Sequence, residues 1–507
     1  MQRAAAGLSA HGIAKGNRVL VHSRNSTAML ETMWASWMIG AVWVPTNFRL
    51  TPPEVAYLAS SSGAAAHIFD PAFPDHADAA RAANPAVRLE VALDASPPPA
   101  GGGRVEGVVG TGREVGTAPS PRPPPARGGG VVWNDLASHP GSFAVPADVD
   151  RDDAAWFFYT SGTTGRPKAA ALTHGQLQFV VNNHLADLIP ATTEQDVSLV
   201  VAPLSHGAGV HALIQVPRGA ASVLLSGDRL DCDEAWRLVE RHRVSNMFTV
   251  PTILTMLTRH EAVDRYDHAS LRYVIYAGSP MYRADQRHAL AKLGNVLVQY
   301  YGMGEVTGAI TVLPAAMHSL DDAAMPVGSC GYPRTGMDVA IFGAEGQQLP
   351  DRETGEICVR GPAVLAIYHD NPEASAKAFA GGWFHTGDLG HMDERGFVFI
   401  TGRASDMYIS GGSNVYPREI EEALLMHPAV IEACVVGMPH PKWGECGVAV
   451  LVAAAPVPEA ELLGRMEGRL ARYKWPARFV FWPELPKSGY GKVEKRTVKR
   501  RLEDANG

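Results

Sequence analysis

The chain has 507 residues, of which 46% are hydrophobic and 19% charged, and its formal net charge is −7. This composition excludes a wholly disordered or collagen-like chain, and the length suggests about three folding units. The chain is mildly acidic and so has no overall positive electrostatic field that would attract nucleic acid, and we expect no nucleic-acid partner. No apolar run reaches the roughly 18 residues of a membrane helix, so we expect no transmembrane segment.

The cysteines are scattered, odd in number and free of any Cys-x-x-Cys pair, which argues against a disulfide framework and against a zinc knuckle. The first residues lack an apolar core of signal-peptide length. We therefore expect a cytoplasmic protein. The cysteines are Cys232, Cys330, Cys358, Cys434 and Cys446.

From Val19 onward, short apolar runs alternate with longer periodic stretches, a pattern that predicts an α/β fold with a mostly parallel, buried sheet. Repeated prolines and glycines interrupt this pattern and predict a flexible, low-complexity loop over residues 95–132. A second change of composition near Ser405 predicts a domain boundary. The expected units are an N-terminal domain, 1–404, and a smaller α+β domain, 405–507.

The most informative segment is 159–168, which follows one apolar run and precedes another. Its hydroxyls, glycines and lysine supply backbone N–H groups and side-chain donors for an anionic phosphate tail. The spacing is not that of a Walker loop, which argues against a P-loop kinase. The candidate ATP-binding residues here are Thr160, Ser161, Gly162, Thr163, Thr164, Gly165 and Lys168.

Segment 159–168 resembles the signature of the AMP-forming acyl-CoA synthetases, a family of the adenylate-forming superfamily that includes fatty-acid and aryl-acid CoA ligases. Segments 276–280, 299–305, 383–388 and 402–421 resemble later motifs of this family in the same order. The resemblance implies a large N-terminal domain of stacked sheets flanked by helices plus a small barrel, followed by a smaller, mobile α+β C-terminal domain.

The resemblance also implies which residues hold the nucleotide. The Asp388 carboxylate can accept two hydrogen bonds from a ribose diol, although a loop-capping aspartate is the alternative. Arg403 offers a fixed fork of donors for ribose or phosphate, with a surface ion pair as its alternative. The further implied ATP-binding residues are Ala277, Gly278, Ser279, Gln299, Tyr300, Tyr301, Gly302 and Lys492.

Three residues are implied to be catalytic. Glu305 is a hard oxygen ligand suited to Mg²⁺ on the ATP phosphates, together with Thr164, and a simple charge at a helix start is the alternative. Lys492 supplies a cation where negative charge develops as a carboxylate attacks the α-phosphate. His206 stands where the family has a gate beside the acyl pocket, and a hydrogen-bonded core histidine is a fair competitor.

The acyl pocket is expected around this histidine, because the small residues after it leave space for an apolar acid. Two methionines would suit the same acid, although ordinary packing explains them almost as well. The predicted pocket residues are His206, Gly207, Ala208, Gly209, Met281 and Met303. For coenzyme A, the resemblance implies a rotation about the hinge Ser405 that brings Gly411 and Gly412 to the pantetheine tunnel, where glycine presents no Cβ.

Three departures from the family pattern stand out. Ser405 replaces the usual Asp or Lys of the hinge, and Gly304 replaces a threonine, which removes a hydrogen bond of about 1.5–3 kcal/mol if nothing compensates. Segment 12–19 resembles one that normally lies several tens of residues further along, so an upstream strand and helix are expected to be missing.

These features predict an ATP-dependent acid–CoA ligase. It would convert an apolar fatty or aryl acid to an acyl-adenylate with release of pyrophosphate, and then form acyl-CoA and AMP, using Mg²⁺. A stand-alone enzyme that loads an acyl carrier protein and a catalytically impaired nucleotide-binding homologue are the alternatives. The motifs specify neither the acid nor the oligomeric state.

Overall fold

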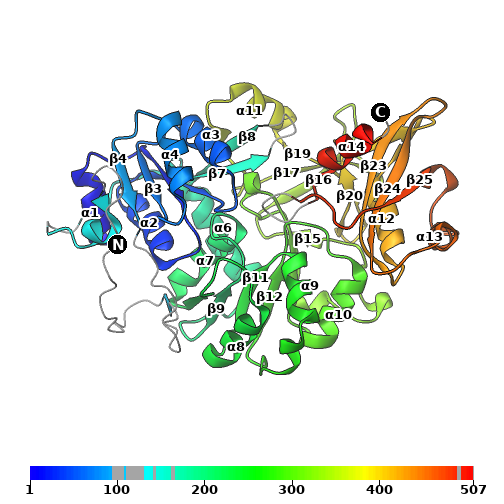
Figure 1. Cartoon of the computed structure of the whole chain (residues 1–507), viewed down its shortest axis with the longest axis horizontal. Coiled ribbons are helices and arrows are strands. Elements are labelled where there is room, and N and C mark those ends of the chain that lie inside the picture. Colours follow the sequence, from blue (N-terminus) through cyan, green and yellow to red (C-terminus); the bar gives the residue numbers. More distant parts are fainter. Residues whose placement is uncertain (94–107, 110–130, 141–143, 162–165, 488–492, 506–507) are drawn as a thin grey trace.

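The computed structural model describes residues 1–93, 108–109, 131–140, 144–161, 166–487 and 493–505. The strands of these residues form four sheets, and helices cover the two largest ones (Figure 1). The predicted α/β class is thereby confirmed.

The first sheet is formed mainly by the N-terminal part of the chain. Its strands are β1 (Arg18–His22), β2 (Val42–Thr46), β3 (Ala66–Phe69), β4 (Leu89–Ala92), β6 (Val131–Val132), β7 (Ala154–Ser161), β8 (Pro167–Thr173) and β18 (Ile367–Tyr368). Among the described residues their order is β18-β8-β7-β2-β1-β3-β4-β6. The strands from β7 to β6 in this order are parallel, and β8 and β18 add antiparallel pairings. The inner strands are buried along their length, as expected when both faces of a parallel sheet are covered.

The second sheet follows the first along the chain. Its strands are β5 (Val108–Val109), β9 (Val197–Val200), β10 (Ala221–Leu224), β11 (Asn246–Thr249), β12 (Tyr273–Tyr276), β13 (Leu297–Tyr301), β14 (Thr311–Leu313) and β15 (Tyr332–Pro333). Within the described ranges they are ordered β15-β14-β13-β12-β11-β9-β10-β5. The central strands are parallel, so the carboxyl ends of β9, β11, β12 and β13 lie at one edge.

The prediction of a continuous loop over 95–132 was wrong at two points. Val108–Val109 pairs with β10 and Val131–Val132 pairs with β4. Adjacent valines have a high strand propensity and here extend existing sheets, which outweighs the surrounding proline and glycine. The other residues of this range lie outside the described ones.

Helices separate and cover the two sheets. They are α1 (Gln2–Ala10), α2 (Thr27–Met38), α3 (Pro52–Ser62), α4 (Pro74–Ala83), α5 (Trp133–Ala137), α6 (His174–Asp187), α7 (Gly207–Gln215), α8 (Cys232–His242), α9 (Pro251–Arg259) and α10 (Arg283–Leu293). Helices α3 and α4 pack on one face of the first sheet. Helices α6 and α7 share one core with both sheets, and α8, α9 and α10 cover the other face of the second sheet. The sequence therefore folds into alternating layers, with α6 and α7 in the middle.

A third sheet, which is antiparallel, follows the second sheet along the chain. Its strands are β16 (Asp338–Phe342), β17 (Gly355–Arg360), β19 (Phe384–Met392) and β20 (Val398–Arg403), hydrogen-bonded in this order. The helix α11 (Pro372–Ala378) precedes β19 and contacts both β18 and β19.

The last part of the chain forms the fourth sheet, at the end of the molecule away from the N-terminus (Figure 1). Its elements are β21 (Tyr408–Ser410), β22 (Ser413–Val415), α12 (Pro417–Leu425), β23 (Val430–His440), β24 (Gly444–Ala453), α13 (Glu459–Met466), β25 (Arg478–Phe481) and α14 (Lys495–Asp504). Two cores on this sheet consist of residues after Ser405. The exact boundary and the mobility of this part stay predictions. Across the described helices, none combines the length and apolar composition of a membrane span.

Candidate nucleotide and acyl site

Most predicted site residues lie at the carboxyl edge of the second sheet, where open α/β sheets bind their ligands. At this edge Tyr276 is the register neighbour of Gln299. The Tyr276 hydroxyl donates to Gln299 Oε1 at 3.0 Å, and Gln286 Nε2 donates to that hydroxyl at 2.7 Å. The predicted ATP-binding residues 277–279 follow directly, with Gly278 at a φ of 87° that favours glycine. Gln299 is thus fixed beside this segment.

The predicted phosphate side is centred on Glu305, which is 5% exposed and lies in the short helix η3 (Gly304–Val306). Thr160 Oγ1 donates to Glu305 Oε1 at 2.7 Å, and the Tyr368 hydroxyl donates to the same oxygen at 3.1 Å. Lys168 Nζ lies 5.6 Å from the centroid of the Tyr368 ring. The structure therefore brings Thr160, Lys168 and Glu305 together, as the sequence predicts, and adds Tyr368.

The predicted ribose side brings Asp388 and Arg403 into one ion pair. Arg403 Nε lies 2.8 Å from Asp388 Oδ1, and the Tyr301 hydroxyl donates to Asp388 Oδ2 at 2.7 Å. The pKa of Arg403 is raised, chiefly by Asp388 and with contributions from Tyr301 and Glu305. Burial and the neighbouring Asp388 raise the pKa of Tyr301 well above its usual range, so this phenol stays a donor. The Asp388 carboxylate thus contacts both the Arg403 guanidinium and the Tyr301 hydroxyl.

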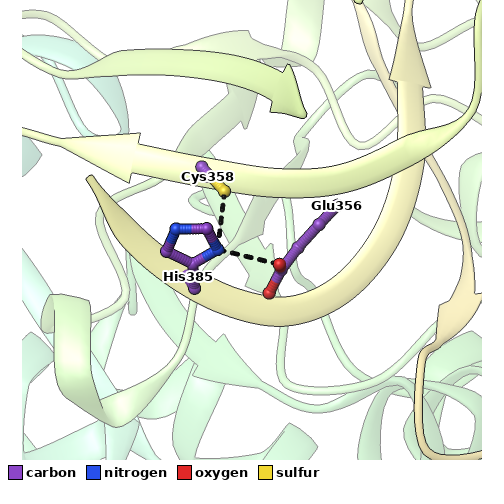
Figure 2. Close-up of side chains that lie close together, drawn as sticks. All are labelled: Glu356, Cys358 and His385. Atoms are coloured by element: carbon purple, nitrogen blue, oxygen red, sulfur yellow. Dashed lines mark hydrogen bonds and ion pairs between the residues drawn. The ribbon is translucent and has the colours of Figure 1, made fainter. Parts of the chain in front are cut away.

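Strand β19 is irregular near Asp388, and Glu356 on β17 forms hydrogen bonds to the residues of this irregular stretch. The register between the two strands shifts between Glu356 and Cys358. Glu356 Oε1 accepts the Gly387 N–H at 2.9 Å, and Glu356 Oε2 accepts His385 Nδ1–H at 2.8 Å (Figure 2). Because Gly387 directly precedes Asp388, Glu356 fixes the backbone that presents the predicted ribose ligand.

Glu356, Cys358 and His385 have ligand-type atoms within 4.8 Å of one another (Figure 2). The carboxylate and the imidazole are already hydrogen-bonded to each other. Burial, with Glu356 nearby, raises the pKa of the Cys358 thiol to about 12, which disfavours the thiolate that a metal needs. The cluster is better explained as support for the Asp388 backbone.

The predicted gate, His206, lies at the start of α7 with its ring 4.8 Å from that of Phe158, measured between centroids. A Cβ on Gly207 would lie 2.5 Å from Phe248 Cζ, and one on Gly209 would lie 2.0 Å from the Leu204 carbonyl oxygen and 2.9 Å from the Trp156 ring. These glycines therefore let aromatic rings pack closely on the backbone. The described atoms leave no room for a Cβ at either glycine, and a contact of these residues with the acid stays a prediction.

Close packing also explains why a glycine, Gly304, stands where the family has a threonine. A Cβ at this position would lie 2.4 Å from Phe158 Cδ1 and 3.0 Å from Thr160 Cγ2. The aromatic ring occupies the space that the family's threonine side chain would need. At Gly302 a Cβ would lie 2.3 Å from the carbonyl carbon of Gly308, so the chain can turn here only without a side chain.

The remaining predicted pocket residues are not brought together. Ala208 and Met303 belong to the core between the two sheets. Met281 instead packs against the core beneath α8, α9 and α10. Its predicted contact with the acid has no support from this placement.

The predicted coenzyme A glycines form a turn. Gly411 and Gly412 connect β21 to β22 with φ angles of 57° and 82°, as in two-residue hairpin turns that favour glycine at both positions. A Cβ on Gly411 would also lie 3.1 Å from Trp443. At the predicted hinge, Ser405 Oγ donates to Asp406 Oδ1 at 3.2 Å. The roles in coenzyme A binding and in rotation stay predictions.

Several predicted residues lie outside the described ones. They are Gly162, Thr163, Thr164, Gly165 and Lys492. The backbone of Ser161 pairs with Pro167 at the end of the β7–β8 ladder, on the first sheet. Thr160 and Lys168, which flank the undescribed stretch, are themselves register partners.

The sequence analysis missed Tyr368, Glu356 and a buried arginine, Arg334. Tyr368 and Glu356 reach the site only through the pairing of β18 with β8 and of β17 with β19. Arg334 follows β15 and is 1% exposed. His385 lies within the Asp388 motif and Glu356 lies on the strand before it, but their contact depends on the register of β17 and β19.

Residues 1–369 match the AMP-binding enzyme family, and residues 419–492 match the AMP-binding enzyme C-terminal domain. The first match spans more than half of the chain, so the chain belongs to the AMP-binding enzyme family. The family predicted from the motifs is thereby confirmed.

Three known proteins illustrate the similarity. Feruloyl-CoA synthase from Amycolatopsis sp is 37% identical over 506 residues, which cover 99% of this chain and 92% of that protein. The fatty acid–[acyl-carrier-protein] ligase ScoC from Streptomyces coeruleorubidus is 32% identical over 507 residues, 99% of this chain and 89% of the relative. The crystal structure of ATP-bound MatB from Rhodopseudomonas palustris has a TM-score of 0.83 and 29% identity, and the match covers 100% of this chain and 92% of the other.

Proposed function

We propose that the chain is an AMP-forming acyl-CoA synthetase, an ATP-dependent ligase that joins an apolar carboxylic acid to coenzyme A. The observation that carries this is the ion pair of Arg403 with Asp388, 2.8 Å between Nε and Oδ1, in which the same carboxylate also accepts the Tyr301 hydroxyl. Tyr301 ends β13, and the short helix η3 that carries Glu305 follows within a few residues. A ribose site and a phosphate site at the end of one strand suit one bound nucleotide.

In the first step, a carboxylate oxygen of the acid attacks the α-phosphorus of ATP. The new O–P bond forms as the bond to the bridging oxygen of the β-phosphate breaks, and pyrophosphate leaves with that oxygen. Asp388 accepts the ribose hydroxyls, and Lys168 faces the phosphates. Lys492 supplies the cation that stabilises the developing charge.

In the second step, the sulfur of coenzyme A attacks the acyl carbon of the adenylate. A C–S bond forms, the C–O bond to AMP breaks, and the thiol proton passes to solvent. AMP is a good leaving group, whereas the oxide of a free carboxylate is not. The C-terminal part turns about Ser405, withdraws Lys492 and brings Gly411 and Gly412 to the pantetheine arm.

Mg²⁺ fits the phosphate side. Two hydroxyls donate to Glu305 Oε1, that of Thr160 at 2.7 Å and that of Tyr368 at 3.1 Å. Oε2 takes part in neither of these hydrogen bonds. A carboxylate oxygen is a ligand that Mg²⁺ prefers. Glu305 and Thr164 would hold the ion, which would neutralise phosphate charge.

A carrier-loading enzyme is the second candidate, because the similar ScoC is named as a ligase of a fatty acid to an acyl carrier protein. Both candidates share the adenylation step and differ in the acceptor thiol.

The test is pyrophosphate release with Mg-ATP across fatty and aryl acids, followed by intact mass of the products with coenzyme A or a phosphopantetheinyl carrier. We expect release that depends on the acid and on Lys492, and a thioester with coenzyme A. Lys487→Ala is the matched control, since Lys487 lies five residues earlier and pairs with Glu432 on the surface. A thioester on the carrier alone would select the second candidate. If the folded protein released pyrophosphate with none of these acids, the adenylation proposal would be overturned and an impaired homologue would be favoured.

A further inference from the structure

Tyr368 lies between two charged groups of the predicted phosphate side, Lys168 and Glu305. It ends the two-residue strand β18, which pairs antiparallel with β8 so that Tyr368 lies opposite Ala170. Lys168 precedes Ala170 by two residues on β8, and both directly opposite residues and residues two apart share a face of the sheet. Lys168 and Tyr368 therefore share one face, with the Lys168 ammonium 5.6 Å from the centroid of the Tyr368 ring.

The backbone around Tyr368 is held by three different elements. Its N–H donates to Ser375 Oγ on α11 at 3.0 Å, and the N–H of the next residue donates to Ala169 O on β8 at 2.9 Å. A few residues earlier, the Leu365 N–H donates to the backbone carbonyl of Glu305 at 2.6 Å. The segment that carries Tyr368 is thus bonded on one side to η3 and on the other to the first sheet and α11.

The Tyr368 hydroxyl acts on the Glu305 carboxylate. It donates to Oε1 at 3.1 Å, and Thr160 Oγ1 donates to the same oxygen at 2.7 Å. Burial, and after it the neighbouring Glu305, raises the pKa of Tyr368 far above its usual range, so the phenol stays a protonated donor. The last torsion of a glutamate side chain is otherwise broad. Two donors on one oxygen therefore fix how the carboxylate is turned and which oxygen remains outside these hydrogen bonds.

We propose that Tyr368 is a positioning residue for the adenylation step: its hydroxyl orients the Glu305 carboxylate for Mg-ATP, and its ring holds the Lys168 ammonium on the same side. This inference rests on the proposed function and adds to it a residue that lies outside the motifs used to predict the site. An ammonium at this distance is attracted by the face of an aromatic ring. Without the hydroxyl, Glu305 Oε1 keeps one of its two hydroxyl donors, and the carboxylate is free to turn.

The experiment measures binding by isothermal titration, with thermal unfolding of each variant in parallel. One titration uses Mg-ATP, and a second uses ATP with EDTA, so that the metal-dependent part of the affinity is separated. The main variant is Tyr368→Phe, which removes the hydroxyl and keeps the ring. Tyr273→Phe is the matched control, because Tyr273 begins β12 at the other edge of the second sheet and its hydroxyl donates to Pro190 O at 2.7 Å.

We expect Tyr368→Phe to raise the Kd for Mg-ATP about tenfold, as the loss of a hydrogen bond to a charged group predicts, and the Kd for metal-free ATP by less than about twofold. Tyr273→Phe should change neither value. Tyr368→Leu also removes the ring, so it should weaken the binding of metal-free ATP as well, because Lys168 loses its aromatic partner. A merely structural role of Tyr368 would instead weaken both forms of ATP equally in Tyr368→Phe.

A double-mutant cycle with Glu305→Ala tests whether the hydroxyl acts through this carboxylate. Once the carboxylate is gone, Tyr368→Phe should raise the Kd for Mg-ATP by less than about twofold further, because residues that act through one contact are not additive. If Tyr368→Phe does not fold, Ser375→Ala carries the test, since it removes the acceptor of the Tyr368 N–H and keeps the phenol. The same selective weakening of Mg-ATP is expected.

Two results would overturn the inference while leaving the proposed function intact. One is an unchanged Kd for Mg-ATP in Tyr368→Phe, and the other is an equal effect of Tyr368→Phe with and without the Glu305 carboxylate. In both cases the wild type would still release pyrophosphate in the presence of an acid. A wild type that neither binds ATP nor releases pyrophosphate would instead refute the proposed function.

Discussion

Replacing Glu356 by glutamine tests how the Asp388 backbone is held. Glu356 accepts one hydrogen bond from Gly387 N–H at 2.9 Å and another from His385 Nδ1–H at 2.8 Å. Glutamine keeps one acceptor oxygen and places an amide NH₂ where the other was, so one of the two hydrogen bonds and the charge are lost.

The expected loss of free energy follows from how exposed the side chains of Glu356 and His385 are. A hydrogen bond to a charged group contributes roughly 1.5–3 kcal/mol. The side chains of Glu356 and His385 are 30% and 26% exposed, so we expect the lower end, about 1.5 kcal/mol. Because Gly387 precedes the predicted ribose ligand, this loss should appear as an approximately tenfold higher KM for ATP, with the KM for the acid unchanged.

The assay is ATP–pyrophosphate exchange at saturating acid, with thermal unfolding measured in parallel. Glu353→Gln is the control, since Glu353 precedes β17, carries the same charge and is exposed. An unchanged KM for ATP in folded Glu356→Gln, or an equal rise in Glu353→Gln, would refute the reasoning.

Three further predictions concern stability and the first chemical step. Gly304→Thr should restore a hydroxyl but lose about 1–3 kcal/mol of stability, because its Cβ would meet the Phe158 ring at 2.4 Å; an unchanged melting temperature with higher activity would contradict this. Burial lowers the pKa of His67 from 6.5 to about 4, so the unfolded chain binds this proton first and stability falls as the pH drops from about 6.5 to 4. In urea titrations against pH, His67→Phe should show a weaker fall than the wild type, and parallel curves would count against the assignment. Lys492→Ala should slow adenylation about 10²–10³-fold yet retain thioester formation from a supplied acyl-adenylate; equal losses in both steps would disprove its assigned role.

The family and the α/β class could be predicted from contiguous motifs, because a phosphate-binding turn or a ribose aspartate is encoded within about ten residues. The same local logic could not show what surrounds Gly207, Gly209 and Gly304. A glycine in the sequence shows only that a side chain is absent. The atoms that occupy the position of the missing Cβ belong to other residues. At Gly207 and Gly304 they are the rings of Phe248 and Phe158, and at Gly209 they are the Leu204 carbonyl oxygen and the Trp156 ring.

The contacts within the site were beyond local prediction for a related reason. Tyr368 reaches Glu305 across 63 positions, and Glu356 reaches Gly387 across 31. Each contact exists because two strands pair in one register, and a shift by one residue would turn these side chains to the other face.

By itself, the sequence determined which chemistry the protein carries: the order of its motifs, the acidic and basic groups for a nucleotide, and the alternation of strands and helices. The tertiary structure alone decided that Tyr300 faces Phe248 while Tyr301 faces Asp388, and that a buried arginine stands behind the first of these rings. Motifs encode the kinds of groups, whereas the shape of the space between them is set by long-range packing.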